Sequence, residues 1–227
     1  MKDSKKPLNF IVLGPQGCGK GTQAKLLLKQ FKNLYYVSTG DFFRKLSAVN
    51  SDAGQRVKKV VVTGDLPYDD LATMLWMHEI AFRVKENQGI LADGFPRRVN
   101  EAHNLYGFLK FLERDKSTLI ILLHISEREA INRLTKRRIC KKCGQLIPWL
   151  GKYKTIIKCD KCGGELEIRA DDNAKGIRKR LAWYKQRAVP ALNYLKKQGL
   201  PLFKINGEQP IEKVFKDILA KINDKLI

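Results

Sequence analysis

Residues 9–22 read NFIVLGPQGCGKGT, in which an apolar run leads directly into a loop with four glycines, one lysine and one threonine. The run Phe10–Leu13 has the length and composition of a buried strand. Behind the loop, apolar residues recur at the spacing of one buried helix face, at Ala24, Leu27, Leu28 and Phe31. The stretch therefore predicts a strand, a glycine-rich loop and a helix in immediate succession.

Within the loop, Gly14, Gly19 and Lys20 have the spacing of a P-loop, and a strand before and a helix after are the context that this motif requires. Glycines let backbone N–H groups approach phosphate oxygens, and a helix N-terminus adds partial positive charge. Lys20 is followed by Gly21, so the hydroxyl that usually binds magnesium comes one residue late, at Thr22, or is not a direct ligand. The loop predicts a site for nucleotide phosphates, and a simple glycine-rich turn is the alternative.

Further along the chain, short apolar strands alternate with amphipathic helices, which predicts an α/β fold: a parallel sheet core flanked by helices. We predict further strands at 35–37, 89–92, 118–125 and 202–205, and helices at 71–84 and after Pro210. Two intervals break this alternation, the polar interval 38–68 and the cysteine-containing interval 134–171. We interpret both as insertions into one P-loop core domain made of residues 1–37, 69–133 and 172–227.

The composition is that of a globular protein, with 44% hydrophobic and 30% charged residues among 227. Its formal charge of +21 favours anionic partners such as nucleotides, but the lysines are scattered, so we expect no specific nucleic-acid partner. No apolar run approaches the ~18 residues of a membrane helix. The opening MKDSKKPLNFIVLG has no small-residue cleavage site, so we expect no signal peptide, no membrane association and a cytoplasmic location.

Four of the five cysteines form two C-x-x-C pairs with fifteen residues between them: Cys140, Cys143, Cys159 and Cys162. This spacing predicts a four-thiolate Zn²⁺ site, and two disulfides or four free thiols are the alternatives. Because all four ligands would be protein groups, the zinc would be structural and not catalytic. The fifth cysteine, Cys18, lies in the glycine loop, where we interpret it as a small filler residue, with redox sensitivity as the alternative.

The loop sequence GPQGCGKGTQAKLL resembles the P-loop of the adenylate kinases and related nucleoside monophosphate kinases, although the proline common at its third position is second here, as Pro15. Further segments match motifs of that family in the same order along nearly the whole chain. They are Ser38-Thr39-Gly40-Asp41-x-x-Arg44, Asp93-Gly94-Phe95-Pro96-Arg97, Arg133-x-x-x-Arg137-Arg138, Arg169-x-Asp171-Asp172, Arg178-Lys179-Arg180-Leu181 and Asn206-Gly207.

The resemblance implies a reversible, Mg²⁺-dependent transfer of the terminal phosphoryl group of ATP to AMP by a monomer. Interval 38–68 would cover the monophosphate, and interval 134–171 would be a zinc-held lid over ATP. The residues implied for catalysis are Lys20, Arg97, Arg133, Arg169 and Arg180. Those implied for ATP binding are Gly14, Gly17, Cys18, Gly19, Lys20, Gly21, Thr22, Arg133, Arg137 and Gln209. Those implied for the monophosphate are Thr39, Arg44, Gly94, Arg97, Glu101, Arg169 and Arg180, and Asp93 would hold Mg²⁺ through water.

Two groups of residues fall outside this pattern. Arg56, Arg83 and Arg114 match no motif, and we interpret them as surface salt-bridge residues. Glu101 stands where family members that act on AMP commonly carry glutamine. An ionised carboxylate only accepts hydrogen bonds, which suits the N1–H and N2–H of guanine better than the N1 of adenine.

Several alternatives therefore stay open. The monophosphate could be GMP, the base preference could be relaxed, or Glu101 could face solvent or a lysine. A basic, zinc-containing nucleic-acid-binding protein is less favoured, because it would leave the P-loop without a role.

Overall fold

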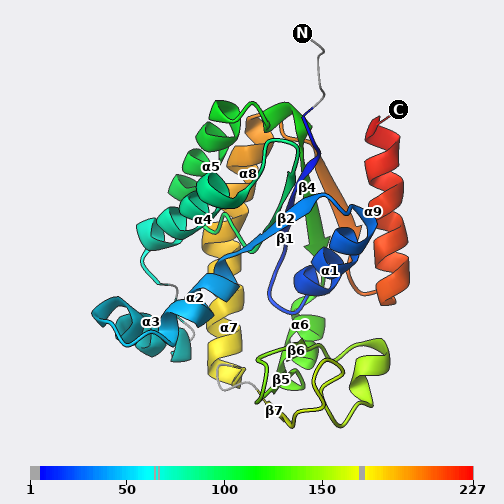
Figure 1. The fold of residues 1–227 in the computed structure, drawn as a ribbon. Coiled ribbons are helices and arrows are strands. Elements are labelled where there is room, and N and C mark those ends of the chain that lie inside the picture. The colour runs from blue at the N-terminus through cyan, green and yellow to red at the C-terminus, as the bar shows by residue number, and fades with distance from the viewer. Residues whose placement is uncertain (1–5, 64, 66, 169–171, 227) are drawn as a thin grey trace.

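The computed structural model describes residues 6–63, 65, 67–168 and 172–226. Its centre is a five-stranded parallel sheet in the order β2-β3-β1-β4-β8 (Figure 1). The strands are β1 Asn9–Leu13, β2 Leu34–Ser38, β3 Gly89–Asp93, β4 Thr118–His124 and β8 Leu202–Asn206. The predicted α/β fold and all five predicted core strands are confirmed. The chain places β2 and β3 on one side of β1 and then β4 and β8 on the other side. In open α/β sheets, ligands bind at the carboxyl ends of the strands where the order changes direction in this way.

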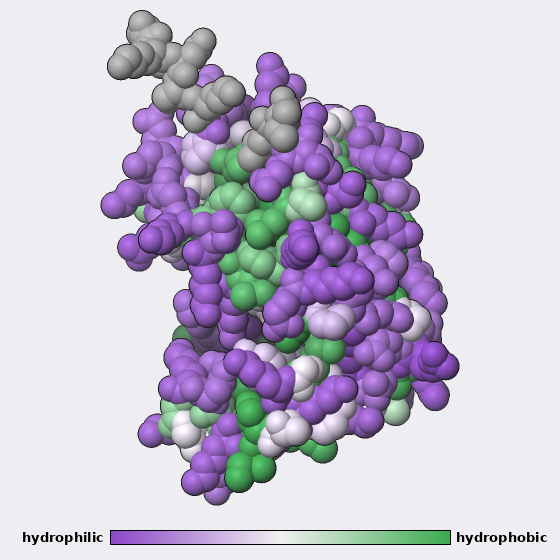
Figure 2. Space-filling view, turned by 90° about the vertical axis from the view of Figure 1, so that its right-hand side faces the viewer, coloured by the Kyte–Doolittle hydropathy of each residue, from purple (hydrophilic) through white to green (hydrophobic). Residues whose placement is uncertain are grey.

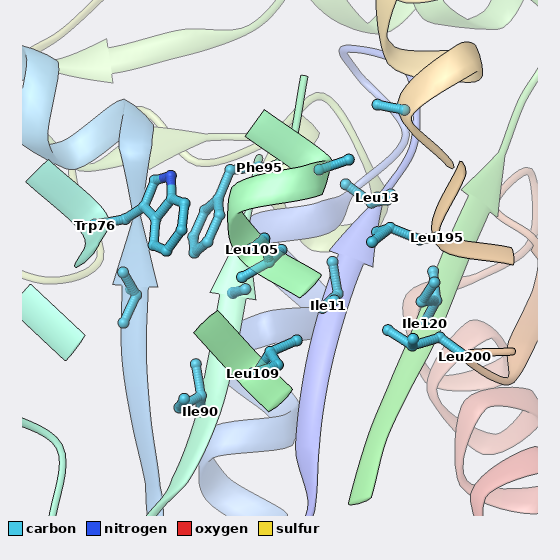
Figure 3. Packing of buried hydrophobic residues seen from close by; sticks show 14 of the residues in the cluster. Ile11, Leu13, Trp76, Ile90, Phe95, Leu105, Leu109, Ile120, Leu195 and Leu200 are labelled. Carbon is cyan, nitrogen blue, oxygen red and sulfur yellow. The ribbon is translucent and has the colours of Figure 1, made fainter. Parts of the chain in front are cut away.

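The first face of the sheet is covered by three helices, α4 Asp69–Arg83, α5 Val99–Phe111 and α8 Val189–Lys197. Ile11 and Leu13 of β1 point to this face, where they join side chains of all three helices. Trp76 of α4 is fully buried and stacks on Phe95, with 5.3 Å between the ring centroids (Figure 3). Leu105, drawn beside them, extends this layer from α5.

The second face is covered by α1 Lys20–Gln30 and α9 Ile211–Leu226. Phe10 and Val12 of β1 point to this face, because successive side chains of a strand alternate between the two faces. Ala24 and Leu27 of α1 pack there, as the sequence periodicity predicts, together with Ile218 of α9. Both faces of β1 are therefore buried, which explains why its sequence is an uninterrupted apolar run.

Helices fill the first interval that breaks the alternation, α2 Thr39–Ser47 and α3 Asp52–Val62. Each begins with a serine cap: the Ser38 hydroxyl accepts from the Asp41 amide, and the Ser51 hydroxyl accepts from the Gly54 amide. In Figure 1, α2 and α3 project away from the carboxyl end of the sheet.

The second interval contains a small antiparallel sheet in the order β6-β5-β7, below the core in Figure 1. Its strands are β5 Arg138–Cys140, β6 Leu146–Ile147 and β7 Leu166–Ile168, with a 3₁₀ turn at Gly151–Lys154. Helix α6 Glu127–Thr135 leads into it and α7 Ala174–Trp183 follows it. A π turn at Tyr184–Ala188 joins α7 to α8, and a 3₁₀ turn at Asp115–Ser117 precedes β4.

Arg114 corrects one prediction, because it is not a surface residue: it is 4% exposed. Its guanidinium donates to the Asn9 side chain at 3.1 Å and to the carbonyls of Gln88, Lys85 and Glu86 at 2.7–3.2 Å. Burial lowers its pKa. The arginine ties the loop before β3 to the start of β1.

Strand β8 is an edge strand, and beside it lies a groove of about 330 Å³. Residues Leu202, Phe203, Lys204, Lys221, Asp224 and Lys225 line this groove. Figure 2 shows apolar surface among hydrophilic side chains on this side of the molecule. Over the residues that the structure describes, every helix is too short or too polar to cross a bilayer.

Candidate active site

The glycine loop adopts a backbone that only glycine takes easily, with φ of 147° at Gly14, 85° at Gly17 and 98° at Gly19. The Lys20 ammonium folds back over the loop and donates to the carbonyls of Gly14 at 2.8 Å and Pro15 at 2.9 Å. Helix α1 begins at Lys20, with no acidic residue in its first turn and no side-chain cap from the described residues. Its first amides and the ammonium therefore face the same space, as an anion site requires.

Cys18 fills the inside of this loop. Its side chain is 2% exposed, and its Sγ lies 3.8 Å from Lys20 Nζ. Burial raises the pKa of the thiol, and the ammonium only partly opposes this effect. A neutral, buried thiol agrees with the interpretation of Cys18 as a filler residue.

Asp93 ends strand β3 and lies opposite Val12 of β1 and Ser38 of β2. The Tyr36 hydroxyl donates to Asp93 Oδ2 at 2.8 Å, and a Cβ on Gly21 would lie 3.7 Å from the same oxygen. Burial raises the pKa of Asp93, while Lys20 and then the Tyr36 hydroxyl lower it. A carboxylate beside the phosphate loop is the oxygen donor that Mg²⁺ prefers, so the residues present fit that ion.

The segment after β3 turns back toward α2. Gly94 has φ of 82°, and its carbonyl accepts from Thr39 Oγ1 at 3.2 Å and from Arg97 Nε at 2.6 Å. Arg44 projects from α2 beside Gly40 and pairs with Asp41. The predicted monophosphate residues of the two motifs are thus brought together.

Arg97 lies within electrostatic reach of two other arginines, Arg44 and Arg180. Burial lowers the pKa of Arg97, and the nearby charges of Arg44 and Arg180 lower it further. Glu101 and Asp93 oppose the shift. Such a proximity of like charges is stabilised by an anion with several oxygens, as a phosphate has.

Glu101 does not face solvent or a lysine, because its side chain is 4% exposed. Its Oε2 accepts from the Arg97 amide at 2.6 Å, and its Oε1 accepts from Trp76 Nε1 at 3.2 Å. The carboxylate therefore fixes the turn that carries Arg97.

Arg137 and Arg180 share the buried carboxylate of Asp172. Arg137 binds it with two hydrogen bonds, Nε to Oδ2 at 2.7 Å and Nη2 to Oδ1 at 2.8 Å. Arg180 donates to Oδ1 at 2.6 Å. Asp172 thus links Arg137 and Arg180 at the point where the cysteine-containing interval joins the core.

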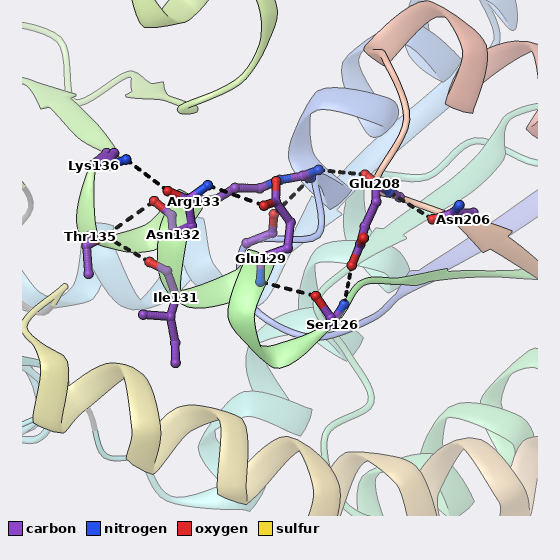
Figure 4. A network of polar contacts seen from close by, with 11 residues as sticks. Ser126, Glu129, Ile131, Asn132, Arg133, Thr135, Lys136, Asn206 and Glu208 are labelled. Carbon is purple, nitrogen blue, oxygen red and sulfur yellow. Dashed lines mark hydrogen bonds and ion pairs between the residues drawn. The ribbon is translucent and has the colours of Figure 1, made fainter.

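Arg133 is held between two loops, as Figure 4 shows, and is 5% exposed. Its Nε donates to Glu129 at 2.6 Å, and its Nη2 donates to the Gly207 carbonyl at 2.9 Å. Its Nη1 lies 3.5 Å from the Gly17 carbonyl in the phosphate loop. The residue joins the phosphate loop to the loop after β8.

The four cysteines of the C-x-x-C pairs meet, with their sulfur atoms within 4.8 Å of one another. The Sγ–Sγ distances are 3.5 Å for Cys140–Cys162 and 3.6 Å for Cys143–Cys159. Tetrahedral Zn–S bonds of about 2.3 Å require sulfur atoms about 3.8 Å apart. None of the five cysteines forms a disulfide, so the predicted disulfide alternative is not observed.

Both cysteine turns have the same backbone geometry. The Gly144 amide donates to the Cys140 carbonyl, and the Gly163 amide donates to the Cys159 carbonyl, each at 2.9 Å. The Cys143 backbone lowers the pKa of Cys140 to about 7. The pKa of Cys162 rises to about 12, because neighbouring sulfurs and burial outweigh the lowering by the Gly164 backbone. Four sulfur atoms this close together form a donor set that fits Zn²⁺, which binds cysteine as thiolate.

Comparison with known proteins identifies the family of this chain. The sequence profile of the adenylate kinases matches residues 12–200 of this chain. The chain belongs to the adenylate kinase family.

Three relatives named adenylate kinase are similar over nearly their whole length. The protein of Thermosipho africanus strain TCF52B is 36% identical over 213 residues, which cover 93% of this chain and 98% of the relative. That of Archaeoglobus fulgidus is 36% identical over 214 residues, covering 94% and 97%. That of Treponema denticola is 37% identical over 216 residues, covering 94% and 99%.

Two further site residues were predicted from the sequence, Arg169 and Gln209. Arg169 lies outside the described residues. The Gln209 amide donates to the Asn206 carbonyl at 3.0 Å and to Asp217 at 2.8 Å, so it is bound to its own loop and to α9.

Sequence reasoning also missed three contacts. Tyr36 reaches Asp93 from the neighbouring strand, and no local pattern signals this contact. Asp172 stood in a matched motif but was given no role. Glu129 precedes Arg133 by four residues on one helix, and this spacing is a recognised signal for an ion pair.

Replacing each of two loop glycines with alanine should affect stability and ATP binding differently. A Cβ on Gly14 would lie 2.2 Å from the Leu123 carbonyl oxygen, so Gly14→Ala should destabilise the fold by about 3 kcal/mol. A Cβ on Gly19 meets no atom within 4 Å, so Gly19→Ala should cost only about 1–2 kcal/mol, from its positive φ. Gly19→Ala should nevertheless weaken ATP binding, because the new methyl group enters the phosphate space. Urea unfolding and ATP titration measure the two effects, and unchanged ATP affinity in Gly19→Ala would contradict the assignment.

Proposed function

We propose that this protein catalyses the reversible, magnesium-dependent transfer of the terminal phosphoryl group of ATP to AMP, giving two molecules of ADP. Its membership of the adenylate kinase family supports this activity, and so do the names of its relatives. The observation that carries the proposal is the pairing of two anion sites across Asp93. Lys20 and the start of α1 would form one of them, and Arg97 with the nearby charges of Arg44 and Arg180 would form the other.

ATP would place its phosphates in the glycine loop. Lys20, which donates to two loop carbonyls in this structure, would donate to phosphate oxygens instead. Gly14, Gly17, Gly19, Gly21 and Thr22 would supply backbone amides around them. Arg133 would form the wall between this loop and the loop after β8, which carries Gln209.

The monophosphate would bind to Arg97 and Arg44, next to Thr39 and Gly94. An oxygen of its phosphate attacks the terminal phosphorus of ATP, and a new P–O bond forms as the bond to the bridging oxygen breaks. The electron pair of the broken bond remains on the terminal oxygen of the ADP that leaves. No covalent bond to the protein is needed, so the arginines act by alignment and charge neutralisation.

Arg137 and Arg180 would neutralise the transferring group. In this structure they are bound to Asp172, which orients both guanidinium groups. Arg169 would act with them, as the sequence resemblance implies. Mg²⁺ bound with ATP would offset the charge of its phosphates, and Asp93 would hold the ion through water.

Two insertions would move on a common core made of residues 1–37, 69–133 and 172–227. Interval 38–68, which carries α2 and α3, would close over the monophosphate. Interval 134–171 would close over ATP as a lid and exclude water, with the four-cysteine site holding structural Zn²⁺. We propose that the protein acts as a monomer.

Substitution of Glu101 tests which base the monophosphate site prefers. Purified protein given Mg-ATP should form ADP fastest with AMP in a panel that also contains GMP, CMP and UMP. Glu101→Gln should shift the ratio of kcat/KM values for AMP and GMP toward AMP by about tenfold, because an amide can donate to adenine N1. It should also cost about 1–2 kcal/mol of stability, since the Arg97 amide or the Trp76 indole loses an acceptor.

Glu79→Gln is the matched control, because Glu79 also accepts from an aromatic side chain, Tyr35, but lies away from Asp93 on α4. Its base preference should equal that of the unaltered protein. An unchanged AMP-to-GMP ratio in Glu101→Gln would exclude a contact between residue 101 and the base. A lack of ADP with every acceptor would overturn the proposed function itself.

A further inference from the structure

The hydroxyl of Tyr36 makes a contact that the proposed reaction does not use. Tyr36 belongs to β2, whose next-but-one residue, Ser38, lies opposite Asp93 at the carboxyl end of β3. The phenol donates its single proton to Asp93 Oδ2 at 2.8 Å. The proton donor of Tyr36 is therefore directed at the carboxylate that would hold Mg²⁺.

The same carboxylate faces a part of the phosphate loop that lacks a side chain. Gly21 follows Lys20 at the position where P-loops commonly carry a hydroxyl, and a Cβ there would be 3.7 Å from Asp93 Oδ2. Tyr36 thus brings a hydroxyl to Asp93 from the neighbouring strand, at a place where the loop supplies none. Among the described residues, the contact from Tyr36 is the one hydrogen bond to this carboxylate that the structure records.

A hydrogen bond to one oxygen restrains the rotation of the carboxylate. With Oδ2 bound to the phenol, Oδ1 is directed away from it and can accept from a water molecule on a metal ion. Groups that orient a metal ligand in this way commonly change metal affinity when they are removed. We propose that Tyr36 is a positioning residue for the Mg²⁺ that accompanies ATP, acting through Asp93. This inference rests on the proposed function.

Packing alone is the competing explanation for Tyr36, because its ring packs against the apolar cluster under α1 and α9. Tyr36→Phe separates the two roles, since it keeps the ring and removes only the hydroxyl. The chain also offers a matched control one residue away. The Tyr35 hydroxyl donates to Glu79 at 2.5 Å, so Tyr35→Phe removes a comparable hydrogen bond to a carboxylate that is not at the site.

The experiment measures the dissociation constant of ATP by isothermal titration, once with excess Mg²⁺ and once with EDTA. Tyr36→Phe should raise the constant for Mg-ATP by about tenfold and leave the constant for metal-free ATP unchanged. Tyr35→Phe should change neither constant. Equal changes in both constants, or no change in either, for Tyr36→Phe would overturn the positioning role.

A rate measurement separates this inference from the proposed function. ADP formation by the unaltered protein tests the transfer reaction, whereas the two dissociation constants do not depend on transfer. If the unaltered protein forms ADP and Tyr36→Phe binds Mg-ATP normally, the positioning role alone is wrong. If the unaltered protein forms no ADP, the proposed function is wrong, whatever the binding constants show.

Discussion

Replacing Arg97 with alanine is expected to lower kcat for ADP formation by about a thousandfold or more. The Arg97 guanidinium is fixed by its hydrogen bond to the Gly94 carbonyl, and its backbone amide is fixed by Glu101. The side chain is thus oriented before any substrate binds, and part of the ordering cost is met by the fold. Removing it deletes one of three neighbouring positive charges at the acceptor site, where the transferred group must be neutralised.

The fold should survive this change. Arg97 lies in a turn outside the helices and strands, and alanine also removes repulsion with Arg44 and Arg180. We expect the free energy of unfolding in urea to stay within about 1 kcal/mol of that of the unaltered protein. KM for AMP should rise together with the loss in kcat, because the same group would bind the ground state and the transition state.

Two variants act as controls for Arg97→Ala. Arg97→Lys keeps the charge but loses the planar fork, so it should recover only part of the lost rate. Arg83→Ala removes an arginine from the exposed end of α4 and should leave kcat unchanged. A rate near that of the unaltered protein in Arg97→Ala would show that the acceptor phosphate binds elsewhere.

The parts of this structure that were predictable from sequence are those encoded by residues close together in the chain. Phe10–Leu13 is apolar on both faces and stands next to the glycine loop, so the strand, its burial and the loop could be inferred together. The cysteine site was predictable for the same reason, because each pair lies on one tight turn and only the meeting of two turns had to be assumed.

Contacts between distant segments were not predictable in this way. Arg114 is an isolated arginine in sequence, and its burial depends on three backbone carbonyls in the loop before β3. A carbonyl acceptor leaves no mark in the sequence, because every residue has one. Glu101 was singled out as a departure from the family pattern, yet its contacts with Trp76 and the Arg97 amide follow from how α4 meets the turn after β3.

The second large effect expected is from removal of the metal at the four-cysteine site. Across residues 138–168, the buried side chains are Cys140, Ile147 and Cys159. Two of these three are cysteines, so this part of the chain has almost no apolar core of its own, and metal–sulfur bonds would supply its stability. We expect a strong chelator, or Cys140→Ser, to lower the Tm of the metal-loaded protein by about 10 °C.

Chemistry in the folded state should change less than stability, because the cysteines lie outside the two anion sites and leave no ligand position open. Metal analysis should find one Zn²⁺ per chain, and adding Zn²⁺ back should restore the Tm of the chelated protein. Asp160→Asn is a control for substitution within a C-x-x-C turn, since Asp160 is exposed and is hydrogen-bonded by Gln145. Its Tm should match that of the unaltered protein. If the chelator removes the metal and the Tm does not fall, the zinc does not hold this interval together, and its small sheet must be stabilised by contacts with the core instead.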